Sequence, residues 1–519
     1  MPPQEKRPAD ARGRRRAPAE DIKAIVWRAA DKLRGPLDMS RYSDVLLGLI
    51  FLKFLSDAFE ERRREVAEKL TEDGVSEGLT AALLEDRSVY SSVRVHWIPE
   101  PARWASIVAN TESPGLDRFI GEAMEAIMRE NASLADIFPP SFGRDLIDRT
   151  RLAEVVLLVA GVPFTGARRA QETLGEVYEY LLDRFARAEG RRGGEFSSPP
   201  SVVRLIVQAL EPYGGKVYDP ACGAGGLLVE AVRFAKAHGG GRQAGLTVLG
   251  QEISERTWRL ARMNLVLHRI DGDLSTRWAD TLADDRQPSL QADFVMSAPP
   301  FNIRDWSRDR NDVRWEYGLP PTGNANYAWL QHVLSKTGEG GSAGIVLANG
   351  SMTSRSGGEY EIRRAMVEGD VVACMIALPS QLFRSTQIPA CLWLLAKDKS
   401  PQSNGGTADR RGQILFVDAR ESGVMADRTE RVLAEADLRR IADVYHAWRG
   451  TASARAAGLS YENEPGFCHT ADVAEVRERG YVLAPGRYVS APPVLPRDRS
   501  TVSPIDPATL MRDVYALFR

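Results

Sequence analysis

The feature that most constrains the fold is an alternation of strand-like and helix-like segments that begins near residue 194. Short apolar runs that are typical of buried strands occur at residues 216–219, 246–253, 292–298, 343–350, 371–379 and 391–397. Helical patterns such as residues 325–336 and 358–369 separate several of them. This alternation predicts an α/β fold with a doubly wound, mainly parallel sheet, which binds ligands outside the carboxyl ends of its strands.

The chain before this alternation has the pattern of an all-helical domain at residues 20–190. Residues 21–35 form a helical pattern that stops at Gly35-Pro36, and residues 43–66 open with an almost continuous apolar run. The Arg-rich residues 1–19 lack the apolar core of a signal peptide, so we expect a disordered basic arm. Two interpretations of this arm remain: it is a solvated tail, or it contacts phosphate groups.

Residues 401–519 are expected to form a C-terminal extension that contains helices. Apolar side chains recur there at helical spacing, at Leu438, Ile441, Val444, Tyr445 and Trp448. Such a stripe packs either on the chain's own sheet domain or on a partner helix, and the pattern alone leaves both open.

Composition excludes several classes of protein. The formal net charge of the 519-residue chain is -2, so any contact with nucleic acid requires a local basic patch or a partner subunit. The four cysteines form no CxxC pair and no zinc-like spacing, so we expect no metal site and a reducing, cytoplasmic setting. No apolar run reaches the ~20 residues that span a bilayer, so we expect no membrane contact.

The first chemical motif is Asp219-Pro-Ala-Cys-Gly-Ala-Gly-Gly, which joins a strand to a helix. It is neither a P-loop nor a GxGxxG dinucleotide loop. A carboxylate at its start repels phosphate and suits a ligand with an ammonium group. The alternative is an ordinary glycine-rich turn between a strand and a helix.

Two further carboxylates follow at predicted strand ends. Glu252 in Gly-Gln-Glu-Ile is placed to accept hydrogen bonds from both hydroxyls of a ribose. Asp280 in Trp-Ala-Asp-Thr-Leu is placed to accept from the amino group of an adenine. The alternatives are a surface carboxylate at a helix start for Glu252 and a helix cap for Asp280.

The last motif runs from Asp293 to Asn302 and places Pro299, Pro300 and Phe301 after a strand. Adjacent prolines fix a rigid turn, and an aromatic ring at its tip can stack on a nucleobase flipped out of a duplex. The alternative is a rigid loop that carries a core phenylalanine.

Taken in order, these motifs resemble the gamma-type amino-methyltransferases, specifically the modification subunits of type I restriction–modification systems. The resemblance covers about residues 20 to 490, and its longest phrases are residues 27–63, 219–228, 250–270, 317–336, 341–352, 361–383 and 480–489. It implies a helical N-terminal domain, a Rossmann-like class I methyltransferase domain at residues 194–400 and a helical C-terminal tail that binds partners. It also implies S-adenosylmethionine as the cofactor and methylation of adenine N6 in DNA. The implied partners are DNA, a specificity subunit with two copies of this chain, and a restriction subunit.

The resemblance assigns roles by position. The segment that wraps the methionine end of the cofactor corresponds to Glu195, Phe196, Ser197, Ser198, Pro199 and Pro200. The cofactor loop corresponds to Asp219, Ala221, Cys222, Gly223 and Gly225, with Glu252 on the ribose and Asp280 on the adenine side. The catalytic tetrapeptide corresponds to Ala298, Pro299, Pro300 and Phe301.

Two positions depart from the family pattern. The family has Tyr-Thr-Pro-Arg where this chain has Ser197 to Pro200, and Asn-Pro-Pro-Phe or Tyr where this chain has Ala298 to Phe301. The asparagine oxygen and the following proline carbonyl hold the hydrogens of the adenine amine, so Ala298 removes one acceptor. Ser297 is expected to point to the opposite side of the strand. We therefore expect methyl transfer to be impaired by about a hundredfold or more.

Three interpretations follow. The chain is an adenine methyltransferase with a variant motif, or an inactive subunit that still binds cofactor and DNA as a scaffold. The third, an unrelated Rossmann-type oxidoreductase, is disfavoured because the GxGxxG loop is missing.

Overall fold

The computed structural model describes residues 19–34, 38–93, 95–140, 142, 147–162, 167–189, 198–239, 245–383, 388–401 and 405–490. The basic arm expected at residues 1–19 lies outside these ranges, apart from Ala19. So do Glu195, Phe196 and Ser197 and the end of the C-terminal extension after residue 490.

The regular elements that the structure describes between residues 19 and 189 are helices, as predicted. They form α1 (Ala19–Leu33), α2 (Met39–Glu72), α3 (Glu77–Leu84), α4 (Ser88–Ser91), α5 (Trp104–Ala109), α6 (Leu116–Glu130), α7 (Arg149–Ala160) and α8 (Ala167–Glu189). The apolar run of the sequence forms the first half of α2, and all residues from Val45 to Ser56 are buried because other helices surround this half. Asp38 caps this helix by accepting a hydrogen bond from the backbone N–H of Arg41.

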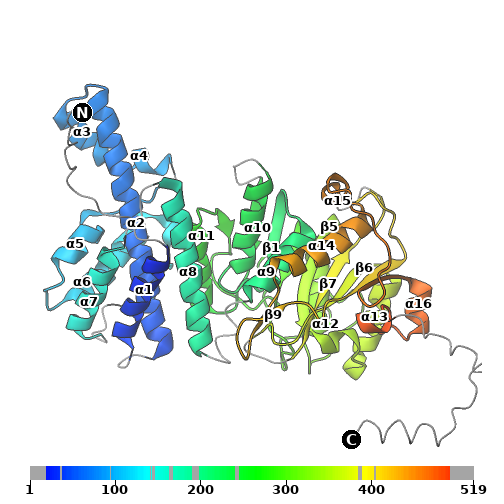
Figure 1. The fold of residues 1–519 in the computed structure, drawn as a ribbon. Helices are drawn as coiled ribbons and strands as arrows, with labels where there is room; N and C mark the ends of the chain where they lie inside the picture. The colour runs from blue at the N-terminus through cyan, green and yellow to red at the C-terminus, as the bar shows by residue number, and fades with distance from the viewer. Residues whose placement is uncertain are drawn as a thin grey trace, which may run out of the picture.

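A nine-stranded sheet forms the centre of the second part of the chain (Figure 1). Its spatial order is β11-β8-β6-β7-β5-β4-β1-β2-β3. The strands are β1 (Gly215–Asp219), β2 (Leu246–Gly250), β3 (Gly272–Asp273), β4 (Ala292–Ser297), β5 (Thr337–Ala348), β6 (Val372–Ala377), β7 (Ala390–Ala396), β8 (Gln413–Asp418) and β11 (Cys468–Asp472). Five of the eight pairings are parallel, so the prediction of a mainly parallel sheet is confirmed. The exceptions are β7, antiparallel to β5 and β6, and β11, antiparallel to β8.

Helices cover both faces of the sheet and give three layers. One buried cluster contains α9 (Pro200–Leu210), α10 (Gly226–His238), α11 (Glu255–Leu267) and α14 (Glu435–Arg449). The cluster on the other face contains α12 (Asn326–Lys336) and α13 (Glu359–Glu368), together with a side chain of α16 (Val473–Glu478). Short elements complete the fold: the hairpin of β9 (Val424–Met425) and β10 (Arg431–Val432), and α15 (Ala452–Ala456).

The C-terminal region corrects the sequence analysis in two ways. The sheet does not end at residue 400, because β8 and β11 extend it through residue 472. The apolar stripe of α14 lies in the chain's own core against α9, with Leu438 and Trp448 fully buried, so it is not a surface for a partner helix. Helical periodicity shows that a face is covered but does not show by what. The partner binding that the resemblance implies for the C-terminal tail therefore does not rest on this stripe and stays a prediction.

The helical domain and the sheet domain share one continuous core along α8 and α11 (Figure 1). Arg259 donates to the carbonyl of Asp136 at 2.9 Å, and Arg262 donates to the carbonyls of Ser133 at 2.7 Å and of Ala135. Gly175 of α8 lies against His268, where a Cβ atom would be 2.3 Å from the imidazole Cε1. This close packing fixes α8 beside the sheet edge that carries the ligand-binding motifs.

Among the described helices, none combines the length and the apolar character needed to cross a membrane.

Candidate active site

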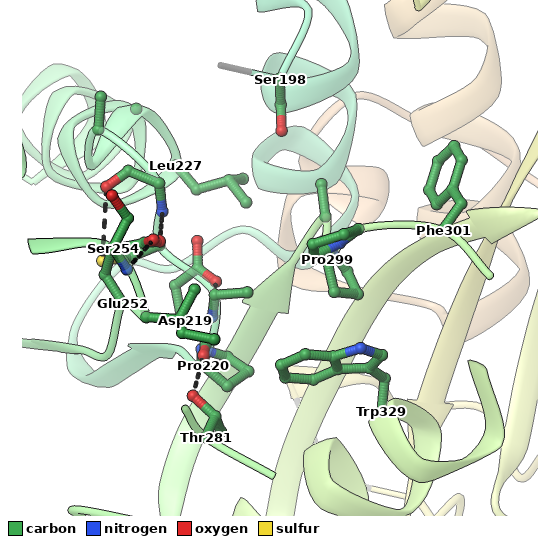
Figure 2. A pocket seen from close by; sticks show the side chains of 18 of the residues that line it. Ser198, Asp219, Pro220, Leu227, Glu252, Ser254, Thr281, Pro299, Phe301 and Trp329 are labelled. Atoms are coloured by element: carbon green, nitrogen blue, oxygen red, sulfur yellow. Dashed lines mark hydrogen bonds between the residues drawn. The ribbon is translucent and has the colours of Figure 1, made fainter. Parts of the chain in front are cut away.

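A cavity of about 830 Å³ lies at the carboxyl ends of β1, β2 and β4 (Figure 2). Its walls come from the loops that follow these strands, from the first residues of α9 and α12, and from Glu179, Leu182 and Asp183 of α8. The helical domain therefore supplies part of the wall.

The loop after β1 turns sharply into α10. Gly223 and Gly225 adopt φ values of 52° and 81°, which favour glycine. The Glu252 carboxylate holds this loop to the end of β2, since it accepts from the backbone N–H groups of Gly223 at 3.0 Å and Ser254 at 2.9 Å (Figure 2). Glu252 thus stands at the cavity wall with a fixed orientation.

A second loop, at residues 279–286, closes the same side of the cavity. The Thr281 hydroxyl donates to the carbonyl of Pro220 at 2.5 Å, and Asp280 accepts from the N–H of Leu282 at 3.0 Å. Buried Gln251 donates to the carbonyls of Ala279 and Asp284. The Gly-Gln-Glu motif therefore fixes both loops on this side of the cavity, one through Glu252 and one through Gln251.

Asp219 is a buried carboxylate at the end of β1. It accepts from the N–H of Ala221 at 3.0 Å and from the Ser297 hydroxyl at 2.9 Å. Burial raises the pKa of Asp219 to about 7, and the nearby Glu252 carboxylate adds to this effect. A cationic group bound at the cavity would favour the ionised form.

The tetrapeptide Ala298 to Phe301 follows β4 and lines the cavity from the opposite side. Phe301 lies edge-to-face with Phe383, with ring centroids 5.1 Å apart. Trp329 of α12 lies below the turn in Figure 2 and lines the same space. An aromatic wall therefore faces the carboxylate-bearing wall.

Neither polar neighbour of the tetrapeptide replaces the missing asparagine. The Ser297 hydroxyl is fully buried and is engaged with Asp219. The Asn302 side-chain oxygen already accepts from Asn326 at 2.9 Å and from Asn324 at 3.2 Å. The side chain of Ser297 thus points toward β1, whereas Ala298 faces the cavity.

The structure brings most of the residues selected from the sequence into this one cavity. Its lining contains Ser198, Pro200, Asp219, Ala221, Cys222, Gly223, Glu252, Asp280, Ala298, Pro299, Pro300 and Phe301. Pro199 and Gly225 are not among the described lining residues: Pro199 caps α9 and Gly225 caps α10. Glu195, Phe196 and Ser197 lie outside the described residues.

Sequence reasoning missed Phe383, Trp329, Thr281, Ile253 and Leu227, which also line the cavity. Phe383 follows β6 and Thr281 precedes β4, so only the position of strand ends at one sheet edge could have suggested them. Trp329 lies on a buried helix, where an aromatic residue is normally read as core.

Comparison with known proteins identifies the family. The family model for N-6 DNA methylases matches residues 169–495, and the model for the HsdM N-terminal domain matches residues 22–159. The chain belongs to the N-6 DNA methylase family. The HsdM N-terminal match runs from α1 into α7, and the N-6 DNA methylase match begins in α8 and continues through the sheet.

Curated relatives of this chain are named as methylase subunits of type I restriction enzymes. The HindI methylase subunit of Haemophilus influenzae is 39% identical over 414 residues, which cover 76% of this chain and 89% of the relative. The MjaIX methylase subunit of Methanocaldococcus jannaschii is 34% identical over 483 residues, which cover 89% of this chain and 83% of the relative.

Two solved structures have a similar fold over most of the chain. The type I restriction-modification system methyltransferase subunit from Streptococcus thermophilus is 25% identical, with a TM-score of 0.73 over 91% of this chain and 100% of that chain. A chain in a structure that addresses complex assembly and conformational transition of the type I R-M system has a TM-score of 0.63 at 20% identity, and the match covers 96% of each chain. At that identity the second likeness bears on the fold alone.

Within the described ranges, no group of three or more His, Cys, Asp or Glu side chains is arranged to hold a metal ion. The four cysteines all fall in these ranges and are buried free thiols.

Proposed function

We propose that the protein is the adenine-N6 DNA methyltransferase subunit of a type I restriction–modification system and that it uses S-adenosylmethionine. The observation that carries the proposal is the single cavity that joins the Asp219 and Glu252 loops to the Ala298–Phe301 turn. A cofactor and a nucleobase must share such a space for a group to pass between them.

The lining residues fit S-adenosylmethionine, whose ammonium and sulfonium groups give it a net positive charge. The carboxylates of Asp219, Glu252 and Asp280 all line the cavity. Ile253 leaves 59% of its surface exposed at this wall, and offers an apolar surface to an adenine ring. The cavity volume of about 830 Å³ lies within the ~300–1,000 Å³ of typical ligand pockets.

When bound, the cofactor supplies an electrophilic methyl group. Asp219 would hold its ammonium end and Glu252 its ribose hydroxyls. Glu252 would accept these hydroxyl hydrogens in addition to the backbone N–H groups of Gly223 and Ser254, since each carboxylate oxygen has two lone pairs.

The target adenine would stack on Phe301, with Phe383 as the neighbouring aromatic surface. Its exocyclic nitrogen is a weak nucleophile because the lone pair is delocalised into the ring. The Pro299 carbonyl can accept one hydrogen of this amine and orient it. Ala298 offers no acceptor for the other hydrogen, which reduces the positioning that drives this reaction.

A second candidate function follows from the alanine at position 298. A chain that binds cofactor and DNA but transfers methyl groups slowly would act as a scaffold subunit. The Ala298 side chain favours the scaffold. The carboxylates of Asp219, Glu252 and Asp280 are compatible with cofactor binding in either candidate function.

We propose DNA, a specificity subunit and a restriction subunit as partners, with two copies of this chain for each specificity subunit. The relatives are named as subunits, which supports assembly. The formal net charge of -2 supports a partner that contributes most of the DNA contact.

The test is calorimetry with S-adenosylmethionine on the full chain, followed by methyl transfer to DNA with the cognate specificity subunit. Cofactor binding together with transfer to adenine supports the enzyme, and binding without transfer supports the scaffold. Absence of cofactor binding would contradict both.

A further inference from the structure

Arg314 lies in the segment between the tetrapeptide and α12, and its side chain is only 10% exposed. It donates to the carbonyl of Thr281 at 2.9 Å through Nη1 and to the carbonyl of Leu282 at 2.7 Å through Nη2. These two residues directly follow Asp280, and all three line the cavity. The guanidinium therefore holds the loop that forms the adenine side of the cofactor site.

Two groups fix the guanidinium itself. The Asp312 carboxylate pairs with it, with Nε 2.8 Å from Oδ2. His332 of α12 lies with Nδ1 2.9 Å from Nη1. Burial lowers the pKa of His332 well below its usual value, and the charges of Arg314 and Lys336 act in the same direction. The ring is therefore neutral, and Nδ1 accepts the hydrogen bond from Arg314.

The loop is thus held from two sides. Thr281 donates through its hydroxyl to Pro220, on the glycine-rich loop, and accepts through its carbonyl from Arg314. Both Thr281 and Leu282 are buried, at 3% and 4% exposure. Arg314 connects this loop to α12, which packs on β4 and β5 beneath the tetrapeptide.

We infer that Arg314 is a positioning residue that holds the Asp280 loop in the shape that binds the adenosine part of the cofactor. Arg314 is not among the described residues that line the cavity, so it acts through Thr281 and Leu282 rather than by contact with the ligand. This inference rests on the proposed cofactor site. A lysine cannot reproduce the interaction, because only the planar guanidinium presents several donors to separate acceptors at once.

The experiment measures the affinity of the full chain for S-adenosylmethionine and for methylthioadenosine, which keeps the adenosine but lacks the amino-acid group. Arg314→Lys should weaken both ligands by about tenfold, since it loses at least one buried hydrogen bond to the loop. Asp312→Asn should weaken both by about threefold, because the guanidinium stays charged but is less firmly held. An equal effect on the two ligands places the loss at the adenosine end.

The matched control is Arg308→Lys. Arg308 lies in the same segment and donates to the carbonyl of Pro320 at 2.7 Å, away from the Asp280 loop. Its ligand affinities should match those of the unmodified chain. Thermal unfolding of each variant without ligand reports on folding, and a general structural defect would lower the melting temperature without changing the affinity of the folded fraction.

Failure of the unmodified chain to bind S-adenosylmethionine would contradict the proposed function. Binding by the unmodified chain with an unchanged affinity in folded Arg314→Lys would overturn the role of Arg314 alone. If Arg314→Lys does not fold, Asp312→Asn decides: a folded Asp312→Asn with unchanged affinity overturns the inference, and a matched loss for both ligands supports it.

Discussion

Replacement of Ala298 by asparagine should raise the rate of methyl transfer by about a hundredfold. In the proposed site the adenine amine would have one acceptor near the tetrapeptide, the Pro299 carbonyl, because Ser297 is engaged with Asp219 and Asn302 with its own asparagine neighbours. The introduced asparagine side chain would restore the second acceptor. A single positioned hydrogen-bonding group of this kind contributes about 2.7–4 kcal/mol to the transition state, and the lower end of that range corresponds to a hundredfold.

The substitution should leave folding and cofactor affinity almost unchanged. Ala298 is partly exposed at the wall of the cavity, which has room for the larger side chain. Most of the gain should therefore appear in kcat rather than in the KM for S-adenosylmethionine, as expected for an interaction made mainly in the transition state.

The assay is transfer of labelled methyl groups to cognate DNA, with the specificity subunit present and both substrates saturating. Ala298→Leu is the matched control, since leucine has nearly the shape of asparagine but no acceptor, and its rate should not rise. Equal kcat values for the unmodified chain and Ala298→Asn would refute the reasoning and would mean that another group already holds the amine.

Four further outcomes are expected. Glu252→Gln should weaken S-adenosylmethionine binding by about tenfold in calorimetry, because a carboxylate that accepts from hydroxyls is lost; unchanged affinity would contradict the ribose assignment. Asp219 has a folded-state pKa of about 7 against an ordinary 3.8, so its contribution to stability is complete below about pH 4 and is lost as the pH rises through 7. Denaturant unfolding of Asp219→Asn should consequently show a smaller fall in unfolding free energy between pH 5 and pH 8, and an identical fall would exclude Asp219 as the source. Trp448→Ala should lower the unfolding free energy by about 3–5 kcal/mol, as for a core residue, whereas a loss of partner binding at unchanged stability would speak for an interface. The chain alone should bind DNA weakly, with strong salt dependence and without sequence preference, and a preference above about a hundredfold in gel shifts would contradict this.

The fold was largely predictable because local patterns report directly on strands and helices. The runs at residues 216–219 and 292–298 became β1 and β4, and the apolar run after residue 43 became the buried half of α2. What failed was the assignment of partners in space. The apolar stripe on α14 correctly predicted that this face of the helix is buried, but only the folded chain shows that α9 covers it.

The residues of the candidate site also fall into two groups, those that a local motif predicts and those that only the folded chain reveals. Asp219, Glu252 and Ala298 belong to compact sequence motifs, so their place at the cavity could be predicted from the residues next to them in the sequence. Phe383 and Arg314 have no such motif, because each reaches the site across more than thirty residues of chain to meet Phe301 and Thr281. Contacts of that kind depend on strand order, which periodicity does not encode.

The contact between the helical domain and α11 has a consequence for how the sequence can change. Arg259 and Arg262 bind backbone carbonyls of residues 133–136 rather than side chains. Any residue presents the same carbonyl, so substitutions in this segment leave the acceptors in place. An insertion or deletion moves all three oxygens at once, and Asp136 is additionally held at a φ of 57° that few residues adopt. The carbonyl contacts of Ser133 and Ala135 should therefore survive changes in residue identity, whereas position 136 should accept only residues that adopt this φ. A change in length should disrupt all three contacts, so homologous helical domains should be exchangeable only when the spacing of this segment is kept.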